Sequence, residues 1–441
     1  VHSYSNHGYG LLGVIAEAAT GFSFAEFVDR TTFTPLGMRA STFQQPPPPT
    51  LRRRLATGYD CSGDECTPLP YDYIAFAPAG ALQATAADMA RFIDMHLRGT
   101  GGVLADSTRR RMHGPQWQPH PALGGMGYGF YRGMVGRHEA LRHAGGWPGW
   151  SSQLVFVPEA GLGYFVAVNT DAAAFTQVLL ERFAGEVLSG PLPPPTADWP
   201  EVPLERYAGT YRLARHAHRG ADKLAVLAGL PMPDLHVEVK GDSGLVVVAG
   251  GARERLYPMG ASSAFVRPGL DPRRFYFETD EQGRAVRIHT DYASLERIPW
   301  WATQEISAWT LAFCLVVFAS AVGAWLVSLL WRGEVPSVLR RARSLAAGAA
   351  VCHLLFVLGL VAAFVMLGPQ EVFQPLPLWV RALFALPFVG GVLGLLTLPA
   401  ALRVWRRLGS LWTRLHYAVV VIAAVAIIPL LAYWNLLSFQ F

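Results

Sequence analysis

The chain has 441 residues, of which 51% are hydrophobic, and its formal net charge is +5. Its length allows roughly two or three domains. The positive charge lies in residues 300–441, whose nine Arg and three Glu give +6, so that residues 1–299 carry −1 and offer no basic face for DNA or RNA.

The N-terminal stretch begins VHSYSNHGYGLLG, with Tyr4-Ser5-Asn6 directly ahead of a predicted helix. This helix covers residues 8–20 and ends at Gly21. Its apolar face is formed by residues at helical spacing, namely Leu11, Leu12, Ile15 and Ala19. An aromatic hydroxyl and an amide held at the start of a helix are typical of a catalytic loop, although a tyrosine in such a place more often serves packing.

A second helix is predicted after Thr85. Thr85 and Asp88 form a Thr-x-x-Asp capping pattern, and Gly99 follows the last turn. The stretch QQPPPPT lies between the two helices, and we expect it to be a spacer.

Cys61 and Cys66, in CSGDEC, are close enough in sequence to form a small disulfide loop, as expected in an oxidising compartment. The alternative is two free thiols. A C-x4-C pattern alone lacks the ligands for a zinc site, and we expect no metal or other cofactor. Cys314 and Cys352 lie in apolar segments and are expected to be packing residues.

The stretch HAGGWPGWSSQLVFVPEAGLGYFVAVNTD predicts three strands. The first begins at His143, and the others cover residues 153–157 and 164–169, with a hairpin turn at PEAGLG. A helix over residues 172–188 closes this domain, which we place at residues 1–190. A proline-rich linker follows at residues 191–203.

Residues 204–299 alternate apolar and polar side chains over short runs that end at Gly and Asp. This pattern predicts a second, small antiparallel domain, either a β-barrel or a sandwich.

Residues 304–441 contain four long uncharged runs, each longer than the ~20 residues that a helix needs to cross a bilayer core. The predicted membrane helices cover about 308–331, 344–367, 382–402 and 415–437. Arginine fills the loops between the first two and between the last two spans, which places those loops in the cytoplasm. The globular part then lies on the extracytoplasmic side of a bacterial inner membrane.

Two motifs could carry chemistry, Tyr4-Ser5-Asn6 and His143-Ala144-Gly145-Gly146. Alone, each is more often packing or a turn. Their context is more specific, because YSNHGYGLLGVIAEAATGFSFAEFVDRTTFTPLGM resembles the serine β-lactamase and penicillin-binding-protein superfamily on its class C side. The resemblance continues through LATGYD, PAGALQATAADMARF and MGYGFY to HAGGWPGWSS, over about residues 1–190. LERYAGTYR, from Leu204, is similar to the start of the β-rich domain often appended to such hydrolases.

The resemblance implies an α+β fold, an antiparallel sheet with flanking helices, and acyl transfer through a serine. By the same resemblance Tyr4 is the candidate base, and Asn6, with Ser5 beside it, binds the substrate amide. His143 stands where the family has Lys or His, Gly145 allows close approach of the substrate, and the Gly146 N–H is the candidate oxyanion donor. A neutral imidazole at position 143 attracts a substrate carboxylate less than an ammonium would.

The family's nucleophile lies in a Ser-x-x-Lys motif, which this sequence does not contain. Its only lysines are Lys223 and Lys240, and neither has a serine three residues earlier. In the family that motif precedes Tyr-x-Asn, so we expect it ahead of Val1, and we expect the chain as given to be inactive. The first strands of the sheet would be absent as well, leaving an unpaired edge.

Three other features have plain structural alternatives. His353, in the middle of a predicted span, is a functional candidate or a neutral histidine bonded to a backbone carbonyl. His216 and His218 are a weak metal candidate or part of a solvated loop. The aromatic WPGW either lines the mouth of the cleft or forms a turn packed on the sheet.

The sequence therefore predicts a membrane-anchored serine hydrolase that cleaves an amide or ester in a small molecule or peptide, such as a D-amino-acid peptide of the cell wall or a β-lactam. One alternative is a non-catalytic penicillin-binding-like sensor that signals through its membrane helices. Another is a transporter or lipid-handling module, against which the scarcity of polar groups in the spans argues. The oligomeric state is open.

Overall fold

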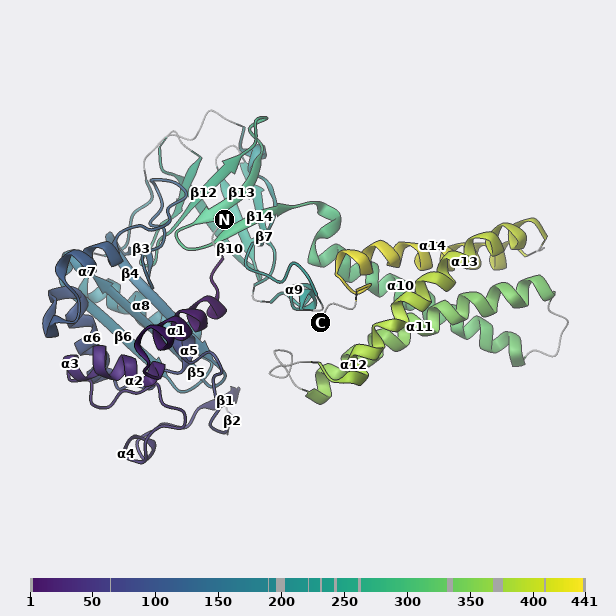
Figure 1. Ribbon diagram of the computed structural model, residues 1–441. Coiled ribbons are helices and arrows are strands. Elements are labelled where there is room, and N and C mark those ends of the chain that lie inside the picture. Colours follow the sequence, from purple (N-terminus) through teal and green to yellow (C-terminus); the bar gives the residue numbers. More distant parts are fainter. Residues whose placement is uncertain are drawn as a thin grey trace. The chain divides into compact units, whose positions relative to one another are not determined.

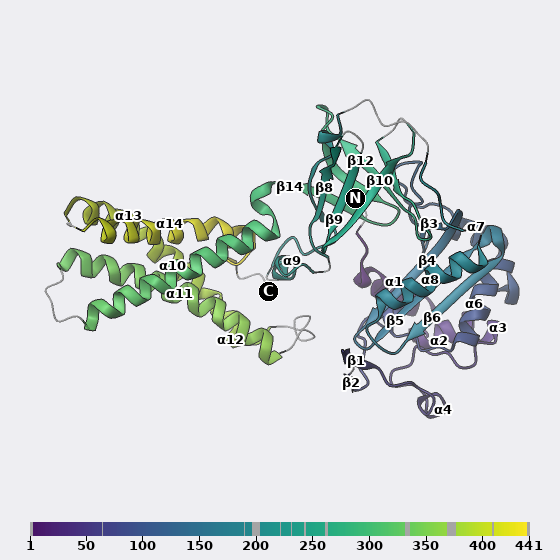
Figure 2. The same ribbon diagram turned by 180° about the vertical axis from the view of Figure 1, so that it is seen from behind.

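The computed structural model describes residues 3–63, 65–188, 190–195, 203–220, 222–230, 232–241, 244–260, 263–330, 336–367, 376–407 and 410–438. The chain forms two compact units (Figures 1 and 2). One comprises residues 1–215 and 236–297, and the other comprises residues 216–235 and 298–441. Most of the predicted linker, residues 196–202, lies outside the described residues.

The first unit contains a four-stranded antiparallel sheet in sequence order: β3 (Tyr131–Val135), β4 (His138–Trp147), β5 (Trp150–Val157) and β6 (Leu162–Val168). The prediction that a strand begins at His143 is wrong, because β4 begins at His138. The sequence reading also missed β3. The β5–β6 hairpin forms at PEAGLG as predicted, and Gly161 takes the left-handed conformation that the turn requires, with φ of 63°.

Helices cover both faces of this sheet, as the period-two alternation of its buried side chains requires. Leu141, Leu154 and Phe156 face α6 (Ala86–Arg98) and the segment that contains Phe33 and Met38. On the opposite face lies α8 (Ala173–Val187), the predicted closing helix, whose inward residues Leu180 and Ala184 contact Ala140, Val155 and Val157. Figure 1 shows α8 and α6 with the sheet between them.

The predicted N-terminal helix is α1 (Asn6–Thr20), and Gly21 ends it in the left-handed conformation. It leads into α2 (Phe24–Val28), a short π-helix (Asp29–Phe33) and α3 (Thr34–Leu36). The apolar face of α1 is exposed, since Leu11, Leu12 and Ile15 each keep more than half of their surface in solvent. α5 (Ala77–Gly80) packs beside α1. A Cβ atom on Gly13 would lie only 2.3 Å from Cγ of Pro78, so the close approach of the two helices requires glycine at this position.

The cap of α6 is as predicted at Thr85, whose hydroxyl accepts a hydrogen bond from the Asp88 N–H at 3.3 Å. The Asp88 carboxylate is buried and binds elsewhere: it accepts from the Ala40 N–H at 2.8 Å and from the Ser41 hydroxyl at 2.9 Å. The helix end is thereby attached to the preceding loop.

Short elements complete this domain. β1 (Tyr59–Ser62) and β2 (Glu65–Pro68) form a hairpin in which Cys61 and Cys66 face each other and are joined by a disulfide. The remaining short helices are α4 (Pro49–Arg52) and α7 (Asp106–His113).

Eight strands between Gly209 and Ile298 form a closed barrel, which decides between the barrel and the sandwich left open by the sequence. Its core is aromatic, with Tyr207, Tyr211, Phe265 and Phe277 almost fully buried. The strands are β7 (Gly209–Leu213), β8 (Leu235–Val239), β9 (Leu245–Ala249), β10 (Ala252–Pro258), β11 (Ala264–Arg267), β12 (Arg273–Thr279), β13 (Ala285–Thr290) and β14 (Ser294–Ile298).

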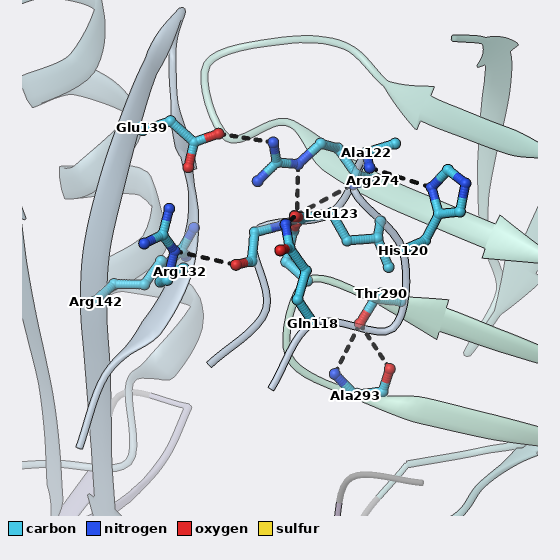
Figure 3. A network of polar contacts seen from close by, with 12 residues as sticks. Gln118, His120, Ala122, Leu123, Arg132, Glu139, Arg142, Arg274, Thr290 and Ala293 are labelled. Carbon is cyan, nitrogen blue, oxygen red and sulfur yellow. Dashed lines mark hydrogen bonds and ion pairs between the residues drawn. The ribbon is translucent and has the colours of Figure 1, made fainter. Parts of the chain in front are cut away.

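Ion pairs join the barrel to β4. The Arg142 guanidinium on β4 donates to the Asp271 carboxylate at 2.5 Å, and both side chains are largely buried. Arg274 donates to Asp291 and to Glu139 of β4, each at 2.8 Å, and Figure 3 shows Glu139 and Arg274 facing each other. The barrel therefore packs directly against the strand that carries His143.

The second unit contains four helices long and apolar enough to cross a membrane, as predicted from the sequence. The helices are α10 (Gln304–Leu330), α11 (Ser337–Leu367), the joined pair α12 (Leu378–Leu383) and α13 (Ala385–Arg407), and α14 (Leu411–Tyr433). α9 (Lys223–Leu227), from the β7–β8 connection, packs against them through Leu224, Val226 and Leu227. Asp234 and Gln304 exchange two hydrogen bonds of 3.0 Å, in each of which the backbone N–H of one residue donates to the side-chain oxygen of the other.

Candidate active site

Tyr4 lies in the loop just ahead of α1, and its ring is half-buried among aromatic rings. The ring centroids lie 5.6 Å from Tyr9, 6.3 Å from Tyr131 and 6.0 Å from His143. The fold therefore brings together the two motifs that the sequence singled out.

The Tyr4 hydroxyl has a raised pKa, because burial disfavours the phenolate and Tyr9 adds to this effect. The Arg215 guanidinium acts in the opposite direction, since its carbon atom Cζ lies 4.8 Å from the centre of the Tyr4 ring. Burial also raises the pKa of Tyr131 to about 12. A proton-accepting role for Tyr4 therefore requires a cation beside it, and Arg215 supplies positive charge on the ring face.

His143 lies inside β4 and stacks on Tyr131, with the ring centroids 5.3 Å apart and the planes 16° apart. Burial lowers the pKa of His143, and a hydrogen bond with the Ala144 backbone opposes this only in part. The ring is consequently neutral at neutral pH, and its charge is not available to bind a carboxylate.

One side of β4 is open beyond His143. The last pair between β3 and β4 is Tyr131 with Arg142, whereas β5 accompanies β4 as far as the pair of Trp147 with Trp150. Among the described residues, the stretch 143–147 has no strand on its other side. An open edge of this kind can bind an extended peptide by strand addition.

The two glycines of the His motif have different surroundings. A Cβ on Gly145 would lie 2.5 Å from the Ser152 hydroxyl on β5, so its small size serves packing within the sheet. A Cβ on Gly146 would meet no described atom within 4 Å. The open space at Gly146 agrees with its expected role as the oxyanion donor. The contact of Gly145 with Ser152 agrees less well with the expected role of Gly145, which is to allow close approach of the substrate.

Ser5 and Asn6 occupy the start of α1. The Ser5 side chain accepts a hydrogen bond from the Gly8 N–H at 3.2 Å and so caps the helix. Asn6 is the first residue of the helix and is exposed. The geometry gives Ser5 a structural task and leaves the Asn6 amide accessible to a ligand.

Aromatic side chains lie near the end of β4. Trp147, which is 39% exposed, donates from its indole N–H to the Asp72 carboxylate at 3.1 Å. Tyr71 and Tyr73 in the same loop contact each other edge to face. In WPGW, Pro148 and Gly149 form the β4–β5 turn, so the motif is a turn, with Trp147 exposed beside it.

Three residues near Tyr4 were missed from the sequence. Tyr131 is the last letter of MGYGFY, a stretch that carried the resemblance, and could have been chosen on that ground. Tyr292, 5.3 Å from Tyr131 between ring centroids, and Arg215 come from the barrel domain. No local pattern in the sequence indicates that these two residues lie beside Tyr131 and Tyr4 of the first domain.

Metal binding has no support in the described part of the chain, where no group of three or more His, Cys, Asp or Glu could hold an ion. His216 and His218 stack on each other, with ring centroids 4.1 Å apart, without a third ligand among those residues.

Comparison with known proteins shows what the first domain is similar to. Residues 1–188 match the family described as Beta-lactamase. "Penicillin-binding protein 4" of Amycolatopsis lactamdurans is 30% identical over 48% of this chain and 59% of its own length. "D-aminopeptidase" of Gluconobacter oxydans (strain 621H) is 28% identical over 64% of this chain and 52% of its own length. A crystal structure titled SurE has 21% identity and a TM-score of 0.43 over 68% of this chain and 69% of that one.

The chain spans between about a half and three-fifths of the length of these curated relatives. The family match and the relatives agree with the motifs at Tyr4 and His143 and with the sheet and helices around them. Over residues 1–188 the chain is therefore similar to the serine β-lactamase and penicillin-binding-protein superfamily.

Proposed function

We propose that this protein is a membrane-anchored serine hydrolase that cleaves an amide or ester through an acyl-enzyme, with its globular part on the extracytoplasmic side of a bacterial inner membrane. The observation that carries the proposal is the approach of Tyr4 to His143 at the open edge of β4. Similarity to a penicillin-binding protein and to a D-aminopeptidase supports substrates of the D-amino-acid peptide class.

In this proposal Tyr4 transfers the proton of the nucleophile, and the positive charge of Arg215 stabilises its phenolate. The substrate backbone pairs with β4 at residues 143–147, the Asn6 amide binds the substrate amide, and the Gly146 N–H stabilises the oxyanion. Because the 441 residues contain no Ser-x-x-Lys, they do not by themselves supply the family's nucleophile. We propose that they have no turnover alone.

The test uses the complete open reading frame in which these residues are encoded, with a fluorescent penicillin and a D-amino-acid anilide as probes. Tyr4→Phe should lower the rate of acylation by about 10²–10⁴, the usual contribution of general acid–base catalysis. Tyr128→Phe, an exposed tyrosine of the same domain, is the matched control and should leave the rate unchanged. Unaltered acylation in Tyr4→Phe would refute the assignment.

A second candidate is a non-catalytic binding protein, favoured by the missing Ser-x-x-Lys. It predicts reversible, non-covalent retention of the penicillin by the complete protein, without a labelled band after denaturation. A labelled band that survives denaturation excludes this candidate.

A further inference from the structure

A small pocket opens between three of the membrane helices, at the end of the bundle where the arginine-rich loops lie. Small side chains of α10 and α11 form its apolar walls, Ala321, Ala324 and Ala346. Its polar lining consists of Arg343 of α11 with Thr413 and His416 of α14. The described lining contains no acidic residue, and its Arg343 and Thr413 side chains carry hydrogen-bond donors.

The polar groups are held in place by contacts within the bundle. The His416 ring nitrogen Nε2 lies 3.0 Å from the Ser320 hydroxyl of α10. That hydroxyl donates to the Val317 carbonyl at 2.7 Å, so it accepts from His416. The Tyr417 hydroxyl, on the pocket's wall, donates to the Ala342 carbonyl at 3.3 Å. The Arg343 side chain, by contrast, has no ion pair or hydrogen bond with any residue that the structure describes.

The depth of the pocket matches the headgroup region of a bilayer. Arg343 lies six residues after the start of α11 and His416 five residues after the start of α14. At 1.5 Å per residue these positions are about 9 Å and 8 Å from the helix ends. α11, with 31 residues, is longer than the bilayer core by roughly 16 Å, which leaves its first turns among the headgroups.

We infer that this pocket binds the phosphate of an anionic phospholipid, with Arg343 as the charged contact and the Thr413 hydroxyl as a hydrogen-bond donor. A basic pocket between membrane helices at this level suits a lipid headgroup, whose phosphate lies in the plane of the site and whose acyl chains continue along the apolar helix surfaces. Free phosphate shares the same recognition chemistry, and the experiment separates the two sources.

The experiment is native mass spectrometry of the full chain in detergent, titrated with phosphatidylglycerol and with phosphatidylcholine of the same acyl chains. The wild type should retain phosphatidylglycerol in preference to phosphatidylcholine. Arg343→Gln should weaken this preference roughly fivefold, the effect of about one basic residue near an anionic surface. The matched control is Arg341→Gln, an exposed arginine of the same helix that does not line the pocket, and it should bind as the wild type does.

Ala324→Leu, which narrows the pocket without changing its charge, should also reduce the retention of phosphatidylglycerol and serves if Arg343→Gln fails to fold. Inorganic phosphate, added in millimolar excess, should not displace the lipid. Equal retention of both lipids, an equal loss in Arg341→Gln, or displacement by inorganic phosphate would each overturn the lipid site.

Discussion

Gly145 and Gly146 are adjacent on β4, but the absence of a side chain serves a different purpose at each position. Substitution by alanine distinguishes these two purposes. A methyl group on Gly145 approaches the Ser152 hydroxyl, whereas one on Gly146 enters open space. Gly146→Ala should therefore leave the thermal unfolding of the detergent-solubilised protein unchanged and still reduce acylation of the complete protein, because the methyl group occupies the space that the substrate needs.

Gly145→Ala should instead lower the stability by about 1 kcal/mol, since the Ser152 side chain must rotate away. The double variant Gly145→Ala/Ser152→Ala should recover most of this loss in the same unfolding measurement. If Gly146→Ala acylates at the wild-type rate, the Gly146 N–H does not lie beside the substrate.

The buried His96 and the partly buried His113 form a pair, with ring nitrogens 3.0 Å apart. Burial lowers the pKa of His96 to about 3, and His113 and Arg109 add to this effect. The folded state therefore holds His96 neutral, whereas the unfolded chain protonates it near pH 6.5, so stability is present above pH 6.5 and lost as the pH falls. Between pH 6.5 and 5 the free energy of unfolding should fall by about 1–2 kcal/mol from His96 alone.

The measurement is denaturant unfolding of the full chain at several pH values. His96→Leu removes one of the two titrating histidines and should reduce the pH dependence over this range, while His113, whose pKa burial lowers to about 4, keeps the remainder. A wild-type stability that is constant from pH 6.5 to 5 would show that the pair is protonated in the folded protein.

The hairpin of β3 and β4 illustrates why part of the fold was missed. Its sequence, YRGMVGRHEALRH, is rich in charge and indicates a solvated loop. In the structure Arg142 and Glu139 pair with barrel residues more than a hundred positions away, and Arg132 donates to the Gly124 and His113 carbonyls. A partner so distant in sequence leaves no periodic signal, so neither β3 nor the start of β4 could be predicted.

Elements whose signals are local were predicted well. The caps at Thr85 and Gly99, the apolar runs of the four membrane helices and the turn at PEAGLG depend on residues close in sequence. In the candidate site, Tyr4 and His143 were predicted from the resemblance to a family, and the structure places their rings 6.0 Å apart. Arg215 and Tyr292 were not, because their approach depends on how the barrel packs against the first domain.

The pair of Arg142 and Asp271 should contribute strongly to the attachment of the barrel. Asp271 also accepts a hydrogen bond from the amide of the partly buried Gln177 at 2.8 Å. Asp271→Ala therefore leaves the buried Arg142 guanidinium without its carboxylate partner. Removal of one member of a buried pair costs about 3–5 kcal/mol. We expect a clearly lower unfolding temperature in detergent. Glu139→Gln, at a pair whose acidic partner is half exposed, is the control and should cost less than about 1 kcal/mol.

If Asp271→Ala has the same unfolding temperature as the wild type, the barrel is held by its apolar contacts. The double variant Arg142→Met/Asp271→Leu should regain stability relative to Asp271→Ala, because it removes the unpaired charge together with its partner.

At the scale of the whole molecule, the arginine-rich loops predict the orientation in the membrane. In spheroplasts, a membrane-impermeant maleimide should label Glu281→Cys, an exposed site at the β12–β13 turn, and should not label Ser410→Cys, in a loop beside α14. Both sites should react after detergent permeabilisation, which controls for reactivity. Labelling of Ser410→Cys in intact spheroplasts would reverse the proposed orientation.

The β7–β8 connection, which packs against the membrane helices, has a practical consequence for preparing a water-soluble form. A cut after Pro299 would remove the helices but retain α9, whose Leu224, Val226 and Leu227 would then lose their apolar surroundings and face water. Such a patch promotes self-association. A soluble globular half therefore requires replacement of residues 216–235 by a short polar turn as well as removal of the C-terminal helices.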